Sequence, residues 1–99
     1  MVNADYSPYF GDSTLKMNTD VYSTYVLNVQ IWLNYLNAAG LDEDGRFGLK
    51  TQTAVEKFQR THTGPDGKSL GVDGQVGKNT KWALWNAGGN KAVPGAVLD

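Results

Sequence analysis

Few residues of this chain could carry out catalysis by themselves. His62 is its only histidine, and the 99 residues include no cysteine. A catalytic zinc site of the usual composition needs two or three histidines, and thiol chemistry needs a cysteine. A serine nucleophile would need His62 beside Ser13, Ser23 or Ser69, none of which lies in a recognisable nucleophile turn. The sequence therefore predicts no metal site and no nucleophile, and His62 is interpreted as a solvated residue near a helix end.

Three consecutive carboxylates occupy residues 42–44 (Asp-Glu-Asp). A carboxylate pair can cleave a glycosidic bond when one member is desolvated and keeps its proton, but nothing in this short polar loop favours desolvation. The segment also fails as a calcium loop. Aligning Gly45 with the loop glycine puts Gly40 at the first ligand position and Thr51 at the twelfth, where a bidentate carboxylate is required. We expect no enzyme activity and no cofactor.

One motif occurs twice. Residues 44–48 (Asp-Gly-Arg-Phe-Gly) return as residues 73–77 (Asp-Gly-Gln-Val-Gly). The first copy is followed by Thr51, Ala54 and Val55, and the second by Thr80, Ala83 and Leu84. Asp-Gly favours a tight turn, and the threonine, alanine and apolar residue share one helical face. Each copy is therefore predicted to form a loop followed by a short helix, as expected of a duplicated unit.

Three helices are predicted to position these loops. The first covers about residues 22–39, with an inner face of Val26, Val29, Leu33 and Leu36, and is ended by Gly40. The second covers about residues 50–62 and the third about residues 79–86. No segment alternates like a strand. The predicted fold is all-α, a small three-helix domain over residues 15–88, with a lead-in at 1–14 and a tail or linker at 89–99.

Composition narrows the possible partners. Nine basic and ten acidic residues give a net charge of −1, which leaves no excess to neutralise a nucleic-acid backbone. No apolar stretch approaches the roughly 20 residues that span a bilayer, so we expect no membrane insertion. We also expect a monomer. The lack of cysteine leaves the compartment open.

Gln30 and Gln59 each follow an inward apolar residue on their helices. A buried amide must find hydrogen-bond partners within the fold. We therefore expect both side chains, together with Thr51 and Thr80, to fix the Asp-Gly loops rather than to contact a ligand.

A larger set of residues resembles the peptidoglycan-binding domain of bacterial and phage cell-wall hydrolases, including endolysins. The resemblance covers roughly residues 15–87 and rests on Leu15, Val26, Val29, Gln30, Leu33, Asn34, Gly40, residues 44–48, Thr51, Ala54, Val55, Phe58, Gln59, residues 72–77, Thr80, Ala83 and Leu84. It implies a non-catalytic module that binds peptidoglycan and anchors a linked hydrolase or envelope protein. It also implies a location outside the cell, in the wall or in the periplasm, or a phage protein acting on the wall.

The sequence departs from the family at residues 18–24, where the usual Gly-Ser turn and second glycine are replaced. Asn18 can occupy the turn and a serine or threonine can cap the helix, so the fold should persist.

Candidate ligand-binding residues are large or polar groups outside the core pattern. The aromatic candidates are Trp32, Tyr35, Trp82 and Trp85, whose rings could stack on sugars or could instead cover the core from its flank. The polar candidates are Arg46 and Gln52, which could bind the carboxylates and amides of a peptide stem or remain solvated. The alternative function is a protein interaction or assembly domain, which a contiguous apolar patch would favour.

Overall fold

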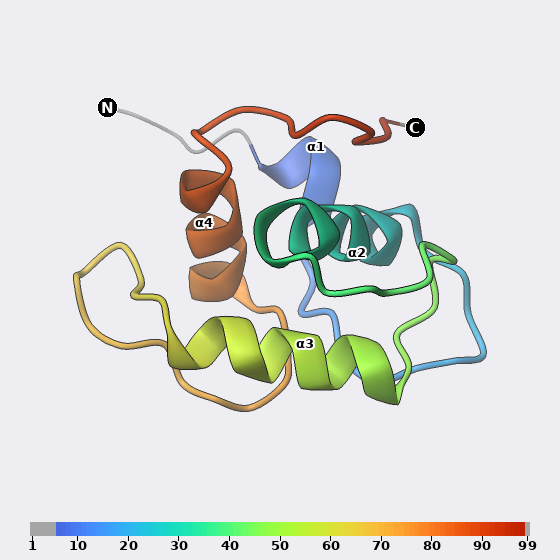
Figure 1. Ribbon diagram of the computed structural model, residues 1–99, viewed down its shortest axis with the longest axis horizontal. Coiled ribbons are helices and arrows are strands. Elements are labelled where there is room, and N and C mark those ends of the chain that lie inside the picture. The colour runs from blue at the N-terminus through green and yellow to red at the C-terminus, as the bar shows by residue number, and fades with distance from the viewer. Residues whose placement is uncertain (1–5, 99) are drawn as a thin grey trace.

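The computed structural model describes residues 6–98, and its helices are α1 (Ser7–Phe10), α2 (Thr24–Asn37), α3 (Leu49–Arg60) and α4 (Lys78–Ala87). No strand occurs within the described residues, so the prediction of an all-α fold is confirmed there. Helices α2, α3 and α4 correspond to the three expected helices, whereas α1 was not expected. In Figure 1, α3 crosses below α2, and α4 stands at one end of both.

Helix α2 is the central element. It begins after Ser23, whose hydroxyl oxygen accepts hydrogen bonds from the backbone N–H groups of Tyr25 and Val26. This confirms the expectation that a serine or threonine caps the helix. The helix ends before Ala38, which adopts a left-handed conformation with φ 50°, so it stops earlier than Gly40. Within the described residues no helix is long and apolar enough to cross a membrane.

An aromatic cluster joins α1 to α2 and α4. Phe10 of α1 packs edge-on against Trp32 with ring centroids 4.7 Å apart, and Tyr9 stacks on Trp85 at 5.8 Å. Phe10 and Trp32 are fully buried. The lead-in segment, expected at residues 1–14, therefore supplies core residues from 6 onward, while residues 1–5 lie outside the described part of the chain.

The segment after α4 also packs on the core, although a tail or linker was expected over residues 89–99. In Figure 1 it runs back over α1 and α2. The buried Asn28 side chain donates to the carbonyls of Tyr9 (2.9 Å) and Val97 (2.8 Å) and accepts from the Val97 N–H (2.8 Å). Val93 is buried as well. The domain boundaries stay a prediction, but both flanking segments contribute to this core.

Lys81 of α4 binds the segment between α1 and α2 through two hydrogen bonds. Its ammonium is almost fully buried and donates to the carbonyls of Gly11 (2.9 Å) and Ser13 (2.6 Å). Burial lowers the pKa of Lys81, and the nearby charge of Asp12 opposes that shift. One antiparallel bridge joins Leu15, in the same segment, to Val76 of the second Asp-Gly loop, and this pairing fixes the segment further.

Candidate functional site

The first Asp-Gly loop is held by Gln30 from α2. The Gln30 amide nitrogen lies within hydrogen-bond distance of Asp44 Oδ1 (3.1 Å), the Arg46 carbonyl (2.9 Å) and Thr51 Oγ1 (3.1 Å). Its amide oxygen accepts from the N–H groups of Asp44 (3.1 Å) and Gly45 (2.9 Å). The side chain is buried, so these partners replace water.

The second loop is held by Gln59 from α3. The Gln59 amide nitrogen reaches Asp73 Oδ1 (3.0 Å), the Gln75 carbonyl (2.8 Å) and Thr80 Oγ1 (3.2 Å). Its oxygen accepts from the N–H groups of Asp73 and Gly74, both at 3.1 Å. The expectation that Gln30 and Gln59 fix the two loops is confirmed.

The carboxylate of Asp44 is stabilised as an anion by the loop itself. Asp44 Oδ1 accepts from the Arg46 backbone N–H (3.0 Å) and from the Gln30 amide. These two bonds, the first being the larger cause, hold the pKa of Asp44 below its ordinary value. Asp44 is therefore ionised at neutral pH, as a turn former would be and a general acid would not.

Each loop borders a shallow groove at the start of the following helix. The first loop groove has a volume of about 350 Å³ and is lined by Gln30, Leu41, Asp42, Asp44, Arg46, Gly48, Leu49, Lys50 and Thr51. The second loop groove, about 390 Å³, is lined by Leu70, Gly71, Asp73, Gln75, Gly77, Lys78, Asn79 and Thr80. Every residue of the second groove stands at the position equivalent to one of the first.

The two loop grooves differ in chemistry, although their lining residues stand at equivalent positions. Arg46 and Lys50 of the first groove are replaced by Gln75 and Asn79 in the second. The lining of the first loop groove therefore has four charged side chains, namely Asp42, Asp44, Arg46 and Lys50, whereas that of the second has two, Asp73 and Lys78, beside amide and hydroxyl groups.

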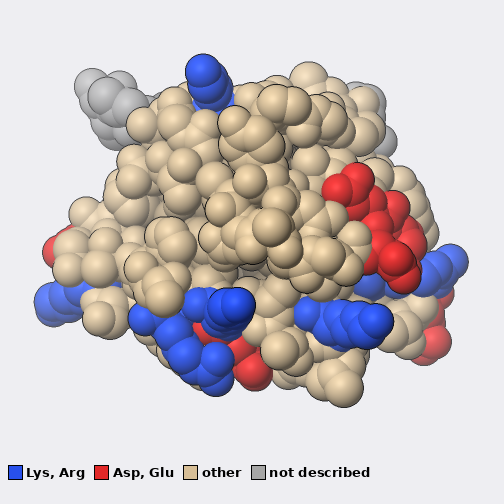
Figure 2. All heavy atoms as spheres, in the orientation of Figure 1, with Lys and Arg blue, Asp and Glu red and all other residues tan. Residues whose placement is uncertain are grey.

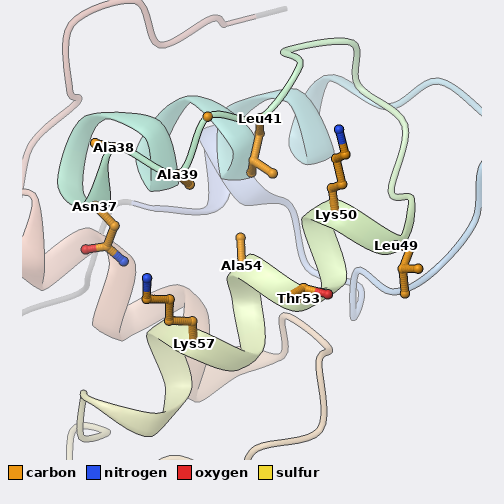
Figure 3. Close-up of a pocket in the computed structure, with 10 residues that line it drawn as sticks. Asn37, Ala38, Ala39, Leu41, Leu49, Lys50, Thr53, Ala54 and Lys57 are labelled. Atoms are coloured by element: carbon orange, nitrogen blue, oxygen red, sulfur yellow. The ribbon is translucent and has the colours of Figure 1, made fainter.

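A third groove, the α2–α3 groove, lies beside the first and has a volume of about 410 Å³. It is lined by residues 37–41, which run from the last residue of α2 into the following loop, and by Leu49, Lys50, Thr53, Ala54 and Lys57 of α3. In Figure 3, Leu41 points from the loop toward Ala54 of α3, and Asn37 and Lys57 point toward each other at one end. Lys50 stands at the other end. The groove shares Leu41, Leu49 and Lys50 with the first loop groove, so the two adjoin each other.

Two of the predicted site residues are in the core. Trp32 is 0% exposed and Trp85 is 7% exposed, and their rings stack with centroids 6.2 Å apart. The expectation that these off-face rings are available to a ligand is wrong. Trp32 is covered because α1, α4 and the C-terminal segment pack on α2 outside its Val26–Leu36 stripe, and Trp85 packs on Tyr9 and Trp32. The Trp32 indole N–H has no acceptor among the described residues and lies against Gly88, where an added Cβ would come within 2.9 Å of it.

The other four predicted site residues reach the surface. Tyr35 is 58% exposed on α2, and Trp82 is half-buried on α4, but neither lines any of the three grooves. Arg46 is exposed in the first loop groove, where its Nη1 also donates to the Thr19 carbonyl at 3.0 Å. Gln52 is half-buried against the second loop, since a Cβ added to Gly74 would meet its Cγ at 2.8 Å. These four are therefore not gathered into one pocket.

Sequence reasoning missed the α2–α3 groove. A signal was present, because Lys50 and Lys57 lie two helical turns apart and so share one face of α3. Leu49 was a second signal, because this apolar residue stands where the second unit has Lys78. In the structure, Leu49 is 70% exposed.

His62 contributes to helix termination. It directly follows the C-cap of α3, and its ring stacks on Phe58 with centroids 3.8 Å apart and an interplanar angle of 15°. Its Nδ1 lies 2.9 Å from the Phe58 carbonyl oxygen and 3.0 Å from Thr61 Oγ1. The residue is half-buried rather than simply solvated.

Comparison with known proteins agrees with the resemblance drawn from the motifs. A family model described as "putative peptidoglycan binding domain" matches residues 23–84, more than half of the chain. The match begins at the cap of α2, includes α3 and both Asp-Gly loops, and ends within α4. Searches of curated proteins and of solved structures gave no match. On the family match, the chain belongs to the peptidoglycan-binding domain family.

Proposed function

We propose that this chain is a non-catalytic module that binds peptidoglycan and anchors a linked hydrolase or envelope protein to the bacterial wall. The observation that carries the proposal is the family match, which spans both glutamine-held loops and the helices that present them. The family is a binding domain, and Asp44 is held ionised for a structural role. The protein would act outside the cell, in the wall or in the periplasm, whether encoded by a bacterium or by a phage.

The mechanism is an increase in the effective concentration of the linked partner near the wall. A module that is bound to an insoluble polymer keeps its linked partner near the wall even when a single contact is weak. Tyr35, Arg46, Gln52 and Trp82 stay candidate contacts because each is at least partly exposed. We expect the module to work as a monomer.

We also infer that the two loop-helix units are copies of one ancestral unit. Support comes from the matching hydrogen bonds of Gln30 and Gln59 and from the position-by-position equivalence of their grooves.

Cosedimentation with purified peptidoglycan sacculi tests the proposed function. The protein should pellet with sacculi at low salt and stay in solution without them. Arg46→Ala and Trp82→Ala should each reduce the bound fraction. Lys91→Ala removes an exposed charge from the segment after α4, outside the three grooves, and should not reduce it. Circular dichroism shows whether each variant is folded. Wild-type protein that remains in the supernatant would exclude wall binding.

A protein interaction domain is the second candidate, and one observation favours it. Four large apolar or aromatic side chains are exposed around the start of α2, namely Met17, Val21, Tyr22 and Tyr25. Exposed apolar side chains that lie together often mark a protein interface. Failure to bind sacculi, together with self-association or partner binding lost in Tyr22→Ser, would support this function instead.

A further inference from the structure

The floor of the α2–α3 groove is apolar and made of small or aliphatic side chains. Ala39, Leu41 and Ala54 contribute to it, and Leu49 lies at its edge with 70% of its surface exposed. In the part of the chain that the structure describes, no aromatic residue lines the groove. Sugars are usually bound against aromatic rings, whereas alkyl side chains such as methyl groups pack against aliphatic ones. The lining therefore suits a ligand with small apolar side chains better than a glycan.

The ends of the groove are cationic. Lys50 and Lys57 stand on the same face of α3, about 10 Å apart along the helix axis. Within residues 6–98 neither ammonium has a hydrogen bond or an ion pair, so both are available to a ligand. Figure 2 shows basic side chains, with some acidic ones between them, over the part of this face where α3 lies in Figure 1. Asn37 adds an amide beside Lys57.

Of the acidic groups near the groove, Glu43 and Asp44 hold hydrogen bonds elsewhere, whereas Asp42 lines the neighbouring first loop groove. Glu43 accepts a hydrogen bond from the Asn34 side chain at 2.9 Å, and Asp44 accepts from its own loop. Among residues 6–98, no Asp or Glu lines the α2–α3 groove itself. An anion placed between the two lysines therefore meets positive charge without a carboxylate in the lining to oppose it.

We propose that the α2–α3 groove binds a short acidic peptide with small apolar side chains, which in the bacterial wall is the peptide stem of peptidoglycan rather than its glycan strand. The assignment rests on the proposed function and names the part of the polymer that is recognised. A volume of about 410 Å³ accommodates a few small residues. Lys50 and Lys57 pair with carboxylates of the stem, Asn37 bonds its amides, and the alanine-rich floor packs its methyl groups.

The test separates the two components of the wall. Purified sacculi are digested with an N-acetylmuramoyl-L-alanine amidase, which releases the peptide stems and leaves peptide-free glycan strands. Each fraction is titrated into ¹⁵N-labelled protein and followed by NMR. The stems should shift the amide signals of residues 37–41 and 49–57, with affinity that falls as salt is added. The glycan strands should leave those signals unchanged.

Charge-matched variants locate the site. Lys50→Gln combined with Lys57→Gln should weaken stem binding at least tenfold, and Leu49→Gln should weaken it severalfold. Lys68→Gln combined with Lys91→Gln removes the same charge from exposed positions outside the groove and should bind as the wild type does. All four lysines and Leu49 are exposed, so folding should persist.

Different failures have different meanings. If the protein binds intact sacculi and peptide-free glycan but not the stems, the peptide assignment is overturned while wall binding stands. If stems bind but the groove variant and its control lose affinity equally, the groove is the wrong site. If neither sacculi nor either fraction binds, the proposed function itself fails.

Discussion

Gln30 of α2 and Gln59 of α3 hold two different loops through the same set of hydrogen bonds. Each amide nitrogen reaches an aspartate side chain, a backbone carbonyl and a threonine hydroxyl, and each amide oxygen accepts from two consecutive backbone N–H groups. One side chain thus fixes a whole loop from the preceding helix. Because the first and second loop grooves are built on these loops, the shape of both grooves depends on the buried Gln30 and Gln59 side chains.

Replacing either glutamine by methionine should destabilise the fold. Gln30→Met and Gln59→Met keep similar volume but leave two backbone N–H groups of each loop without their acceptor. Each change should lower the free energy of unfolding by about 2–4 kcal/mol, because a desolvated donor without a partner is costly. Urea unfolding followed by tryptophan fluorescence measures the difference.

Gln75→Met is the matched control for these two variants. The Gln75 side chain is exposed, so its replacement should change stability by no more than about 0.5 kcal/mol. Equal losses in all three variants would mean that the buried networks are not the source of the effect.

The stabilisation that the first loop gives to the fold should depend on pH in the acid range. The pKa of Asp44 is lowered in the folded protein, so on acidification the unfolded chain takes up a proton first. The stabilisation is complete above about pH 4 and is lost as the pH falls toward the lowered value. Asp44→Asn, which cannot ionise, should be less stable than the wild type at pH 7, and the gap should narrow by about pH 2.5. Urea unfolding at the two pH values measures it.

Asp42→Asn provides the comparison, because it removes the same charge from the same loop without removing a hydrogen bond that the structure contains. Its stability should follow the wild type through the acid range. A gap between Asp44→Asn and the wild type that is constant with pH would show that the ionised carboxylate does not stabilise the loop.

The parts of the fold that are encoded locally could be predicted from the sequence. Three helices follow from apolar periodicity, and the roles of Gln30 and Gln59 follow from a polar residue beside an inward apolar one. Both inferences need only neighbours within a few residues. Helix ends were less predictable, because the end of α2 is set by the left-handed Ala38 rather than by Gly40.

The parts that depend on distant packing could not be predicted. Trp32 was a candidate for ligand contact because the helical period of α2 marks only one face as inner. It is buried because Phe10 and Trp85 approach from elements far away in sequence. The α2–α3 groove was not predicted for the same reason. Lys50 and Lys57 share one face of α3, but Asn37 and Lys57 meet only in the folded chain.

Lys81 should control the docking of the segment before α2. Lys81→Met leaves the carbonyls of Gly11 and Ser13 without their donor and should lower the free energy of unfolding by about 1–3 kcal/mol. Hydrogen exchange should quicken most at the amide of Leu15, whose N–H pairs with the Val76 carbonyl. Lys78→Met, on the exposed surface of the same helix, should change neither quantity. Unaltered exchange in Lys81→Met would mean that the bridge to Val76 holds the segment alone.

Trp32 and Tyr35, one helical turn apart on α2, should respond to truncation in opposite ways. Trp32→Ala opens a cavity in the aromatic cluster and should cost about 3–5 kcal/mol of stability, so any loss of sacculus binding would follow from unfolding. Tyr35→Ala removes a ring that is 58% exposed, should leave stability within about 0.5 kcal/mol of the wild type, and weakens sacculus binding if Tyr35 contacts the wall. Unfolding curves and cosedimentation on the same samples separate the two effects. A stable Trp32→Ala protein would contradict the central place of this ring in the core, and full binding by a folded Tyr35→Ala protein would remove Tyr35 from the binding surface.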